Sequence, residues 1–299
     1  MPVFAGIEAG GTKFNCILGS GPRDVLAETR ISTTTPDETL GKVIRFFEAH
    51  QKEYQINGIG IAAFGPVDPE PESETYGYIT TTVKPGWAYT NIVGDIRGAF
   101  GLPIGFDTDV NAAAIGEYIW GAGQGINVLV YITVGTGIGG GCLIGGKPLH
   151  GARTPDIGHI RIPHNWEKDP YPGFCKVHGD CLQGLAAGPA IEGRWGIPGY
   201  KLPQDHPAWN LEAEYLALGI TNIIGILAPC RIVLGGGVMQ SEFLIPMVRK
   251  EVIKQLKGYW EIPLIFDHID TYIVPPGLGK RSGALGALAL ARIAAEKSL

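Results

Sequence analysis

Two glycine turns constrain the fold of this chain more than any other feature, because each joins two apolar runs that are typical of paired β-strands. The first turn, Gly10-Gly11, joins residues 3–9 to residues 14–20. The second turn lies within residues 135–141. Sliding the first hairpin by 126 positions aligns three pairs, namely Gly11 with Gly137, Cys16 with Cys142 and Gly19 with Gly145. A duplicated domain produces such a repeat.

Strand and helix patterns alternate along the rest of the chain. Short apolar runs predict further strands at residues 58–65, 127–134, 142–146 and 230–237. Apolar residues at helical spacing predict helices near residues 40–47, 111–123, 211–228, 241–260 and 282–299. A length of 299 residues is more than one core usually serves. We therefore expect two α/β domains, residues 1–116 with the last helix (about 282–299) and residues 117–281, the second containing a loop at 146–184.

Composition narrows the class of protein. Apolar residues make up 45% of the chain and charged residues 18%, which favours extensive burial. The net charge of −5 lacks the basic excess that nucleic acids and anionic membranes attract. Residues 1–10 do not resemble a secretory signal, and no long unbroken apolar segment follows, so we expect a cytoplasmic protein. Three of its five cysteines, Cys16, Cys142 and Cys230, lie in apolar runs where buried thiols are common.

The glycine turns are candidates for binding phosphate. Glycine permits a positive φ and has no side chain to obstruct a ligand, so consecutive backbone N–H groups can face anionic oxygens. A single glycine turn is more often a plain hairpin, but a pair of turns favours a nucleotide, with Lys13 or a cation screening its charge. A third turn, within residues 233–240, follows a predicted strand and offers bare backbone to a nucleobase or ribose.

A short segment, FCKVHGDC, contains Cys175, His178 and Cys181 at three-residue steps. In a cytosolic chain this spacing indicates metal ligands and not a disulfide. A structural zinc site has four ligands, so one more is expected. The candidates for that fourth ligand are His159, His164, His150 and Asp180.

A carboxylate is also needed if the nucleotide donates its phosphoryl group to a hydroxyl, because the hydroxyl must lose a proton. Asp107 and Asp109 end the predicted strand PIGFDTD, and period-two alternation places both on one face. The spacing does not choose between them. Asp109 or Asn111 could instead cap the helix expected to start near Ala112. Glu117 is interpreted as a helix-surface or inter-motif residue without a role in the site.

Taken together, several motifs resemble those of the ROK family of repressors, open reading frames and kinases. They are GIEAGGTK, DTDVNAAAIGE, TVGTGIGGG, PDIGH, the Cys/His segment and LGGGV, in the family's order over nearly the whole chain. The start GIEAGGTKF and the stretch KPGWA (Lys84–Ala88) are most similar to the bacterial fructokinase branch. The resemblance implies an actin-like, two-domain ATPase fold with a zinc-bound loop. It also implies transfer of the γ-phosphoryl of ATP, accompanied by magnesium, to a hexose, with fructose ahead of mannose, glucose and N-acetylmannosamine.

The resemblance also assigns roles to individual residues. The family's D-x-N-x-x-A pattern matches Asp109, Asn111 and Ala114, which makes Asp109 the general base and Asn111 a sugar ligand. It selects His159 as the fourth zinc ligand, beside Cys175, His178 and Cys181, and as a sugar contact. The expected ATP contacts are Gly10, Gly11, Thr12, Lys13, Thr133, Gly135, Thr136, Gly137, Pro189, Gly235, Gly236, Gly237, Val238 and Met239.

Three positions depart from the family's usual residues. Asp156 and Gln183, both expected to contact the sugar, stand where most members have Glu, and Glu8 stands where Asp is usual. The longer Glu8 side chain is expected to reach magnesium through water. Because Asp156 precedes His159 by three residues, we expect zinc to order the sugar site and to leave ATP binding unchanged. We also expect a homodimer. A zinc-dependent sugar-sensing or interaction protein is the non-enzymatic alternative, and no helix-turn-helix segment precedes Glu8 to suggest a repressor.

Overall fold

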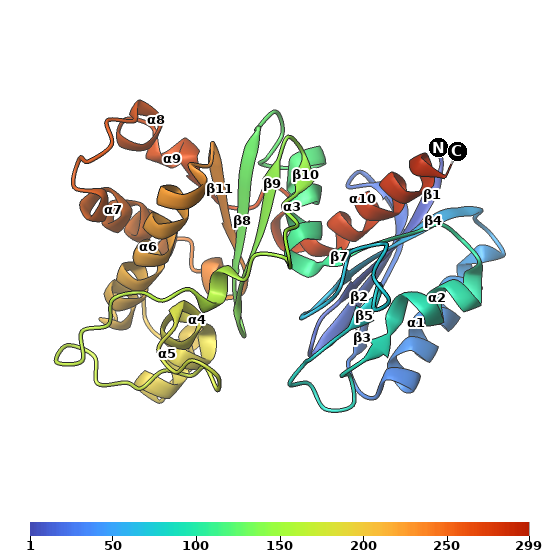
Figure 1. The fold of residues 1–299 in the computed structure, drawn as a ribbon, viewed down its shortest axis with the longest axis horizontal. Helices are drawn as coiled ribbons and strands as arrows, with labels where there is room; N and C mark the ends of the chain where they lie inside the picture. The colour runs from blue at the N-terminus through green and yellow to red at the C-terminus, as the bar shows by residue number, and fades with distance from the viewer. Residues whose placement is uncertain (299) are drawn as a thin grey trace. The chain divides into compact units, whose positions relative to one another are not determined.

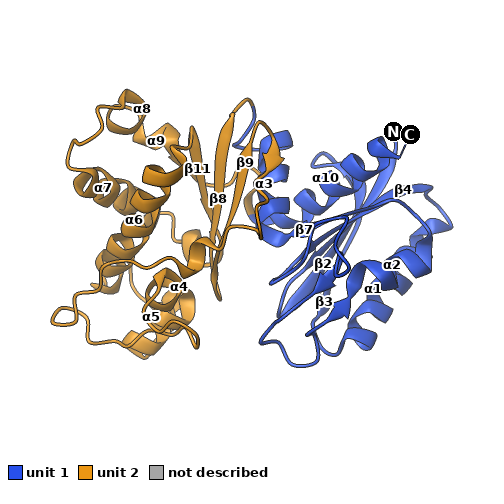
Figure 2. Cartoon of the chain, in the orientation of Figure 1, with its two compact units in different colours: residues 1–124, 280–299 blue, residues 125–279 orange. Residues whose placement is uncertain are grey.

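The computed structural model describes residues 1–298 and contains two compact units. Unit 1 comprises residues 1–124 together with the chain from residue 280, and unit 2 comprises residues 125–279 (Figure 2). The boundary expected after residue 116 falls inside helix α3 (Asp109–Trp120), which belongs entirely to unit 1. The C-terminal helix α10 (Ser282–Lys297) is also part of unit 1.

Unit 1 is built on a five-stranded sheet with the order β3-β2-β1-β4-β7. The strands are β1 (Val3–Ala9), β2 (Lys13–Gly21), β3 (Asp24–Ser32), β4 (Ile56–Ala63) and β7 (Ile104–Thr108). β1, β4 and β7 run parallel, whereas β1, β2 and β3 form an antiparallel meander. Figure 1 shows α10 and α3 on one face of this sheet, with α1 (Pro36–Gln51) and α2 (Ile92–Phe100) on the other. A small ribbon pairs β5 (Tyr78–Ile79) with β6 (Thr90–Asn91).

Glycine lets α10 lie directly on the sheet of unit 1. A Cβ atom placed on Gly60 of β4 would lie 1.8 Å from the Ala287 carbonyl oxygen of α10, so any side chain there would overlap backbone. A Cβ atom on Gly286 of α10 would lie 1.9 Å from the Ala112 carbonyl oxygen of α3. The close approach of these two helices and the sheet fixes the start of α10 beside β1.

Unit 2 repeats the same arrangement, with the sheet order β10-β9-β8-β11-β12. Its strands are β8 (Val128–Val134), β9 (Ile138–Ile144), β10 (Lys147–Pro148), β11 (Arg231–Gly235) and β12 (Ile273–Val274). The matching strand order in both sheets is what the internal repeat predicts. One detail differs from expectation: the return strand begins at Ile138 and not at Cys142, because Gly139, Gly140 and Gly141 pair with β8.

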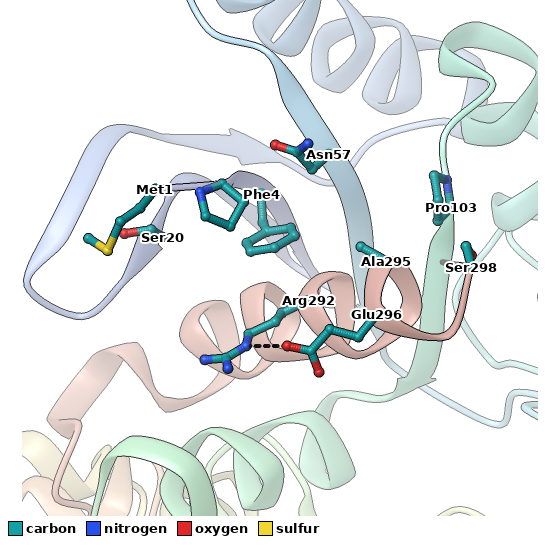
Figure 3. A pocket seen from close by; sticks show the side chains of 10 residues that line it. Met1, Phe4, Ser20, Asn57, Pro103, Arg292, Ala295, Glu296 and Ser298 are labelled. Atoms are coloured by element: carbon teal, nitrogen blue, oxygen red, sulfur yellow. Dashed lines mark hydrogen bonds and ion pairs between the residues drawn. The ribbon is translucent and has the colours of Figure 1, made fainter.

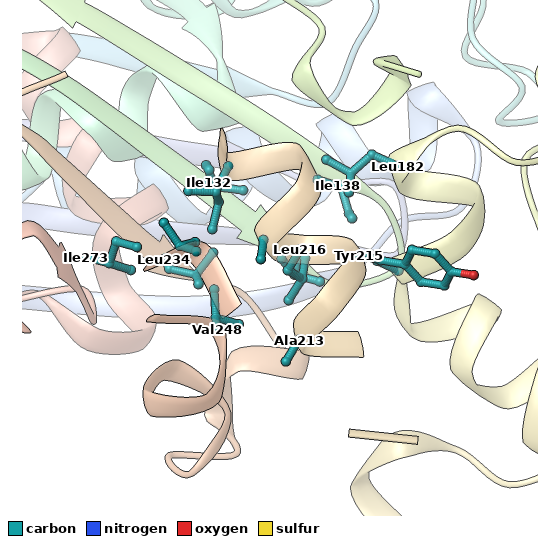
Figure 4. Packing of buried hydrophobic residues seen from close by; sticks show 14 of the residues in the cluster. Ile132, Ile138, Leu182, Ala213, Tyr215, Leu216, Leu234, Val248 and Ile273 are labelled. Atoms are coloured by element: carbon teal, nitrogen blue, oxygen red, sulfur yellow. The ribbon is translucent and has the colours of Figure 1, made fainter. Parts of the chain in front are cut away.

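Helices α6 (Ala208–Leu227) and α7 (Leu244–Leu256) cover one face of this second sheet and bury its core. Figure 4 shows Ile132 and Leu234 of the strands directed toward Leu216 of α6 and Val248 of α7. The remaining elements are short: η1 (Ile157–His159), α4 (Leu182–Ala186), α5 (Gly188–Trp195), η2 (Gly199–Lys201), η3 (Val238–Gln240), α8 (Pro263–Phe266), α9 (Ile269–Tyr272) and η4 (Gly279–Arg281). The segment from Gly146 to Cys181 therefore contains little regular structure.

Candidate active site and metal cluster

The structure gives different surroundings to the two candidate carboxylates at the end of β7. Asp107 is buried, and its Oδ1 accepts hydrogen bonds from the Thr108 N–H at 2.7 Å and from the Asn111 Nδ2 at 2.8 Å. Asp109 is half-buried and occupies the first turn of α3. Asp107 therefore fixes the local backbone and the Asn111 side chain. The Asp109 Oδ1 accepts a hydrogen bond from the N–H of the next residue, Val110, at 2.9 Å.

Helix capping does not explain Asp109 or Asn111. The N-cap of α3 is Thr108, whose hydroxyl oxygen accepts the Asn111 backbone N–H at 3.1 Å. The helix begins at Asp109, earlier than the expected start near Ala112. The interpretation of Asp109 or Asn111 as a cap is therefore wrong, and the Asp109 carboxyl is left available for chemistry.

Burial and a neighbouring acid tune the Asp109 carboxyl. Burial, with a smaller contribution from the nearby Glu8 carboxylate, raises the pKa of Asp109 to about 7. Glu8 lies on β1, accepts a hydrogen bond from Asn15 Nδ2 at 2.7 Å, and has a pKa that burial also raises. A general base is most effective when its pKa is close to the operating pH. Asp109 meets that condition near neutrality.

The start of α10 is packed against Glu8. A Cβ atom on Gly283 would lie 2.3 Å from the Glu8 Oε1, so a side chain there would displace the Glu8 carboxylate. The glycine keeps the carboxylate in place without a clash.

The first glycine turn is closed by a hydrogen bond from the Gly10 N–H to the Lys13 carbonyl oxygen at 3.0 Å. Apart from Gly11 and its two neighbours in the chain, no atom of the described residues lies within 4 Å of the position that a Cβ atom on Gly11 would occupy, and Thr12 is exposed. The turn therefore offers open backbone on one side. Neither Gly11 nor Gly137 has the positive φ that glycine permits, whereas Gly236 in the third turn has a φ of 99°.

In unit 2, three predicted nucleotide segments lie together. The Gly188 N–H at the start of α5 donates to the Gly135 carbonyl oxygen at 2.8 Å. A Cβ atom on Gly135 would lie 3.8 Å from the Gly237 nitrogen, and one on Gly188 would lie 3.6 Å from a methyl carbon of Val238. The second turn, the start of α5 with Pro189, and the third turn therefore form one cluster of bare backbone.

Four side chains of unit 2 converge as metal ligands would. The ligating atoms of His159, Cys175, His178 and Cys181 all lie within 4.8 Å of one another. His159 Nδ1 lies 3.4 Å from Cys181 Sγ, 3.7 Å from Cys175 Sγ and 3.2 Å from His178 Nδ1. A tetrahedral zinc ion with ordinary bond lengths would separate its ligands by roughly 3.3 to 3.8 Å. The donor set and its spacing both fit zinc, and Cys175 and Cys181 are free thiols.

The other candidates for the fourth ligand have different partners. His164 is buried, with Nε2 2.9 Å from the Asp169 carbonyl oxygen and Nδ1 3.3 Å from Asp180 Oδ2. His150 is exposed and is not one of the four converging residues. The geometry thus favours His159 over His164, His150 and Asp180.

Two predicted sugar contacts flank this cluster. The Nε2 of His159, on the side of the ring away from the sulfur atoms, lies 3.8 Å from Asp156 Oδ2. At this separation the two groups are close but not hydrogen-bonded. Gln183, two residues after Cys181, directs its Oε1 to the Ile138 N–H at 3.0 Å, next to the second glycine turn.

Of the two expectations for Glu117, the surface position is wrong. This residue is fully buried and not on the surface, with Oε1 accepting the Ser282 hydroxyl at 2.7 Å and Oε2 accepting the Ala122 N–H at 2.7 Å. It therefore links the end of α3 to the start of α10. The signal for burial was the run Ala112–Gly116, which leaves α3 without a polar face ahead of Glu117.

A separate cavity of about 510 Å³ opens at the other end of the sheet in unit 1 (Figure 3). Its lining includes Met1, Phe4, Asn57 and the ion pair between Arg292 and Glu296. None of the predicted site residues is among the described residues that line it.

Two α/β units with the same strand order and with glycine turns after their first strands define an actin-like ATPase fold. A model described as the ROK family matches residues 4–294, and the chain belongs to this family. The chain is 43% identical over 300 residues to a fructokinase of Zymomonas mobilis, covering 99% of this chain and 98% of the relative. It is 41% identical to a fructokinase of Lactococcus lactis, covering 95% of each.

Solved structures agree with the expected fold class, which is confirmed. A ROK hexokinase from Thermus thermophilus superimposes with a TM-score of 0.79 at 26% identity, covering 99% of both chains. A ROK family glucokinase from Streptomyces griseus, in complex with glucose and AMPPNP, gives a TM-score of 0.79 at 24% identity, covering 97% of this chain and 99% of that one. Within residues 1–298, no helix combines the length and apolar character needed to cross a bilayer.

Proposed function

We propose that this chain is an ATP-dependent hexose kinase that transfers the γ-phosphoryl group of ATP to fructose and forms fructose 6-phosphate and ADP. Relatives more than 40% identical over nearly their whole length carry the name fructokinase, which supports this choice of sugar. The structural observation that carries the proposal is the Asp109 carboxyl, with its pKa raised to about 7.

In this mechanism Asp109 accepts the proton of the sugar hydroxyl while the hydroxyl oxygen bonds to the γ-phosphorus of ATP. The bond between that phosphorus and the oxygen of the leaving ADP breaks. Asn111, held by Asp107, hydrogen-bonds another sugar hydroxyl. Asp156, His159 and Gln183 are the proposed further sugar contacts. The open backbone at Gly11 in unit 1, and the cluster of glycine turns in unit 2, bind the phosphates and the nucleoside.

Two metal ions belong to this proposal. A zinc ion held by His159, Cys175, His178 and Cys181 has a closed ligand set, so it would supply rigidity and no open coordination position. A magnesium ion would neutralise phosphate charge. Glu8 is the residue that we propose to contact this magnesium ion through water. Its carboxylate lies against the start of α10.

Purified protein should be tested against fructose, mannose, glucose and N-acetylmannosamine with ATP in an assay coupled to ADP release. We expect the highest kcat/KM with fructose. A higher kcat/KM with another of these sugars would contradict fructose as the preferred substrate but would still support a hexose kinase. Bound zinc without ATP turnover on any of them would favour a sugar-sensing or interaction protein.

The remaining parts of the proposal concern the setting of the enzyme. We propose a homodimer in the cytoplasm, where the free thiols of Cys175 and Cys181 stay reduced and can bind metal. We propose no nucleic-acid or membrane partner, in line with the net charge of −5. Light scattering that gives the mass of one chain, 31.9 kDa, at every concentration would contradict the dimer.

A further inference from the structure

The metal cluster and the second glycine turn are joined by a single side chain. Cys181 ends the ligand set, and α4 begins at the next residue. Gln183 in the first turn of α4 accepts the Ile138 N–H through its Oε1 at 3.0 Å. Ile138 is the first residue of β9 and directly follows the turn at residues 135–137. A Cβ atom on Gly137 would lie 2.6 Å from the same Gln183 oxygen, so the side chain lies against the turn itself.

The other side of the cluster contacts the same strand start. Gly158 precedes the ligand His159 in η1, and a Cβ atom on it would lie 1.9 Å from the Ile138 carbonyl oxygen. Both the N–H and the carbonyl of Ile138 are therefore approached by residues within two positions of a predicted metal ligand. Beyond α4, the Gly188 N–H donates to the Gly135 carbonyl oxygen at the other end of the turn.

These contacts leave the second turn with little freedom as long as α4 and η1 stay in place. The backbone N–H groups of a phosphate-binding turn are useful only when they are already directed at the ligand, because ordering them on binding would cost free energy. A ligand set that holds His159 and Cys181 together also holds Gly158 and Gln183, and through them Ile138.

We propose that Gln183 is a positioning residue for the second glycine turn, and that the metal cluster strengthens nucleotide binding through it. This inference rests on the proposed function, in which that turn binds ATP. It replaces the expectation that zinc acts on the sugar site alone, because the Gln183 oxygen contacts the nucleotide turn and not only the sugar side.

The bond at position 183 requires a side-chain oxygen that can accept the Ile138 N–H, and the amide group of glutamine is not itself necessary. Glutamate can accept the Ile138 N–H in the same way, whereas leucine of similar size cannot. Gln183→Leu should therefore free this amide, and Gln183→Glu should retain the bond. Gln204→Leu, at an exposed glutamine of the same unit, is the matched control.

The direct test is hydrogen exchange of the Ile138 amide, combined with calorimetric titration of ADP and AMPPNP in the absence of sugar. We expect Gln183→Leu to speed exchange at Ile138 and to weaken nucleotide binding about three- to tenfold, the effect of losing one hydrogen bond. Gln204→Leu should match the wild type in both measurements, and Gln183→Glu, which keeps the acceptor but adds a negative charge near the turn, should keep the slow exchange at Ile138. Unchanged exchange and affinity in Gln183→Leu would overturn the proposal and leave Gln183 as a sugar contact only.

Metal removal gives a second, independent test. Chelation of the wild type should weaken AMPPNP binding and loosen Ile138, whereas the same treatment of Gln183→Leu should add little, because the link is already broken. Equal losses in both proteins would overturn the coupling. Failure of the untreated wild type to bind nucleotide would instead contradict the proposed function, so the two failures are distinguishable.

Discussion

At the scale of single residues, the charge on Asp109 decides the chemistry. Since burial and the Glu8 carboxylate raise the pKa of Asp109 to about 7, the base is protonated in acid and active above neutrality. We predict that kcat/KM for fructose rises with pH through about 7. Glu8→Gln removes a neighbouring negative charge and should lower the pKa of Asp109, which moves this rise toward acid. A pH profile measured at saturating magnesium checks the shift. A rise at the same pH in both proteins would contradict the electrostatic link.

A second residue-scale prediction concerns Glu212 in α6. Its carboxyl is buried, neither oxygen has a hydrogen-bond partner among the described residues, and burial raises the pKa of Glu212 well above its ordinary value. The folded state therefore holds a proton that the unfolded chain releases above about pH 4.5. The stability that the protonated Glu212 contributes is fully present in acid, and it is lost as the pH rises toward the pKa of Glu212 in the folded state. Glu212→Gln does not titrate, so its stability relative to the wild type should increase from pH 5 to pH 8 in denaturant titrations. A constant difference would show that Glu212 ionises normally.

At the scale of elements, the docking of α10 on the sheet of unit 1 is the feature most sensitive to substitution. A side chain at Gly60 would overlap the Ala287 carbonyl. We predict that Gly60→Val lowers the free energy of unfolding by about 3 kcal/mol or more, since overpacked backbone cannot relax easily. Gly98→Ala in α2, where the added methyl meets no atom within 4 Å, should raise it by about 0.5 to 1 kcal/mol. Similar stability of the two variants in urea would contradict the packing.

The elements also show what sequence alone can predict. The hairpins and the last helix follow directly from apolar periodicity, and the actual elements β1, β2, β8 and α10 lie where it places them. Periodicity could not show that residues 139–141 are strand, because glycine signals a turn until its partner strand is known. It also could not reveal the buried roles of Glu117 or Asp107, whose bonds depend on neighbours distant in sequence or on the exact start of α3. The Cys/His spacing was specific enough to predict the cluster, but only the fold shows that Gln183 contacts Ile138.

At the scale of the whole molecule, the segment between β10 and α4 has little regular structure, and the proposed zinc site would order it. Such a segment is costly to order without a crosslink. We predict about one zinc per chain by elemental analysis, as a single four-ligand site requires. His159→Ala should lose the zinc, whereas His164→Ala, which removes a side chain bonded to Asp169 and Asp180, should retain it. Retention of zinc by the first variant, or its loss by the second with folding intact, would contradict the assigned ligand set.

The whole account depends on one carboxylate as the general base, and the most direct measurement is kcat for fructose phosphorylation by Asp109→Asn. The account predicts a loss of about a hundredfold to ten-thousandfold in kcat, with ATP affinity nearly unchanged, because the base acts only on the sugar hydroxyl. Asp107→Asn should lose much less, since its buried role is to hold Asn111 and the backbone at Thr108. Equal losses in the two variants, or a kcat of Asp109→Asn close to that of the wild type, would contradict it.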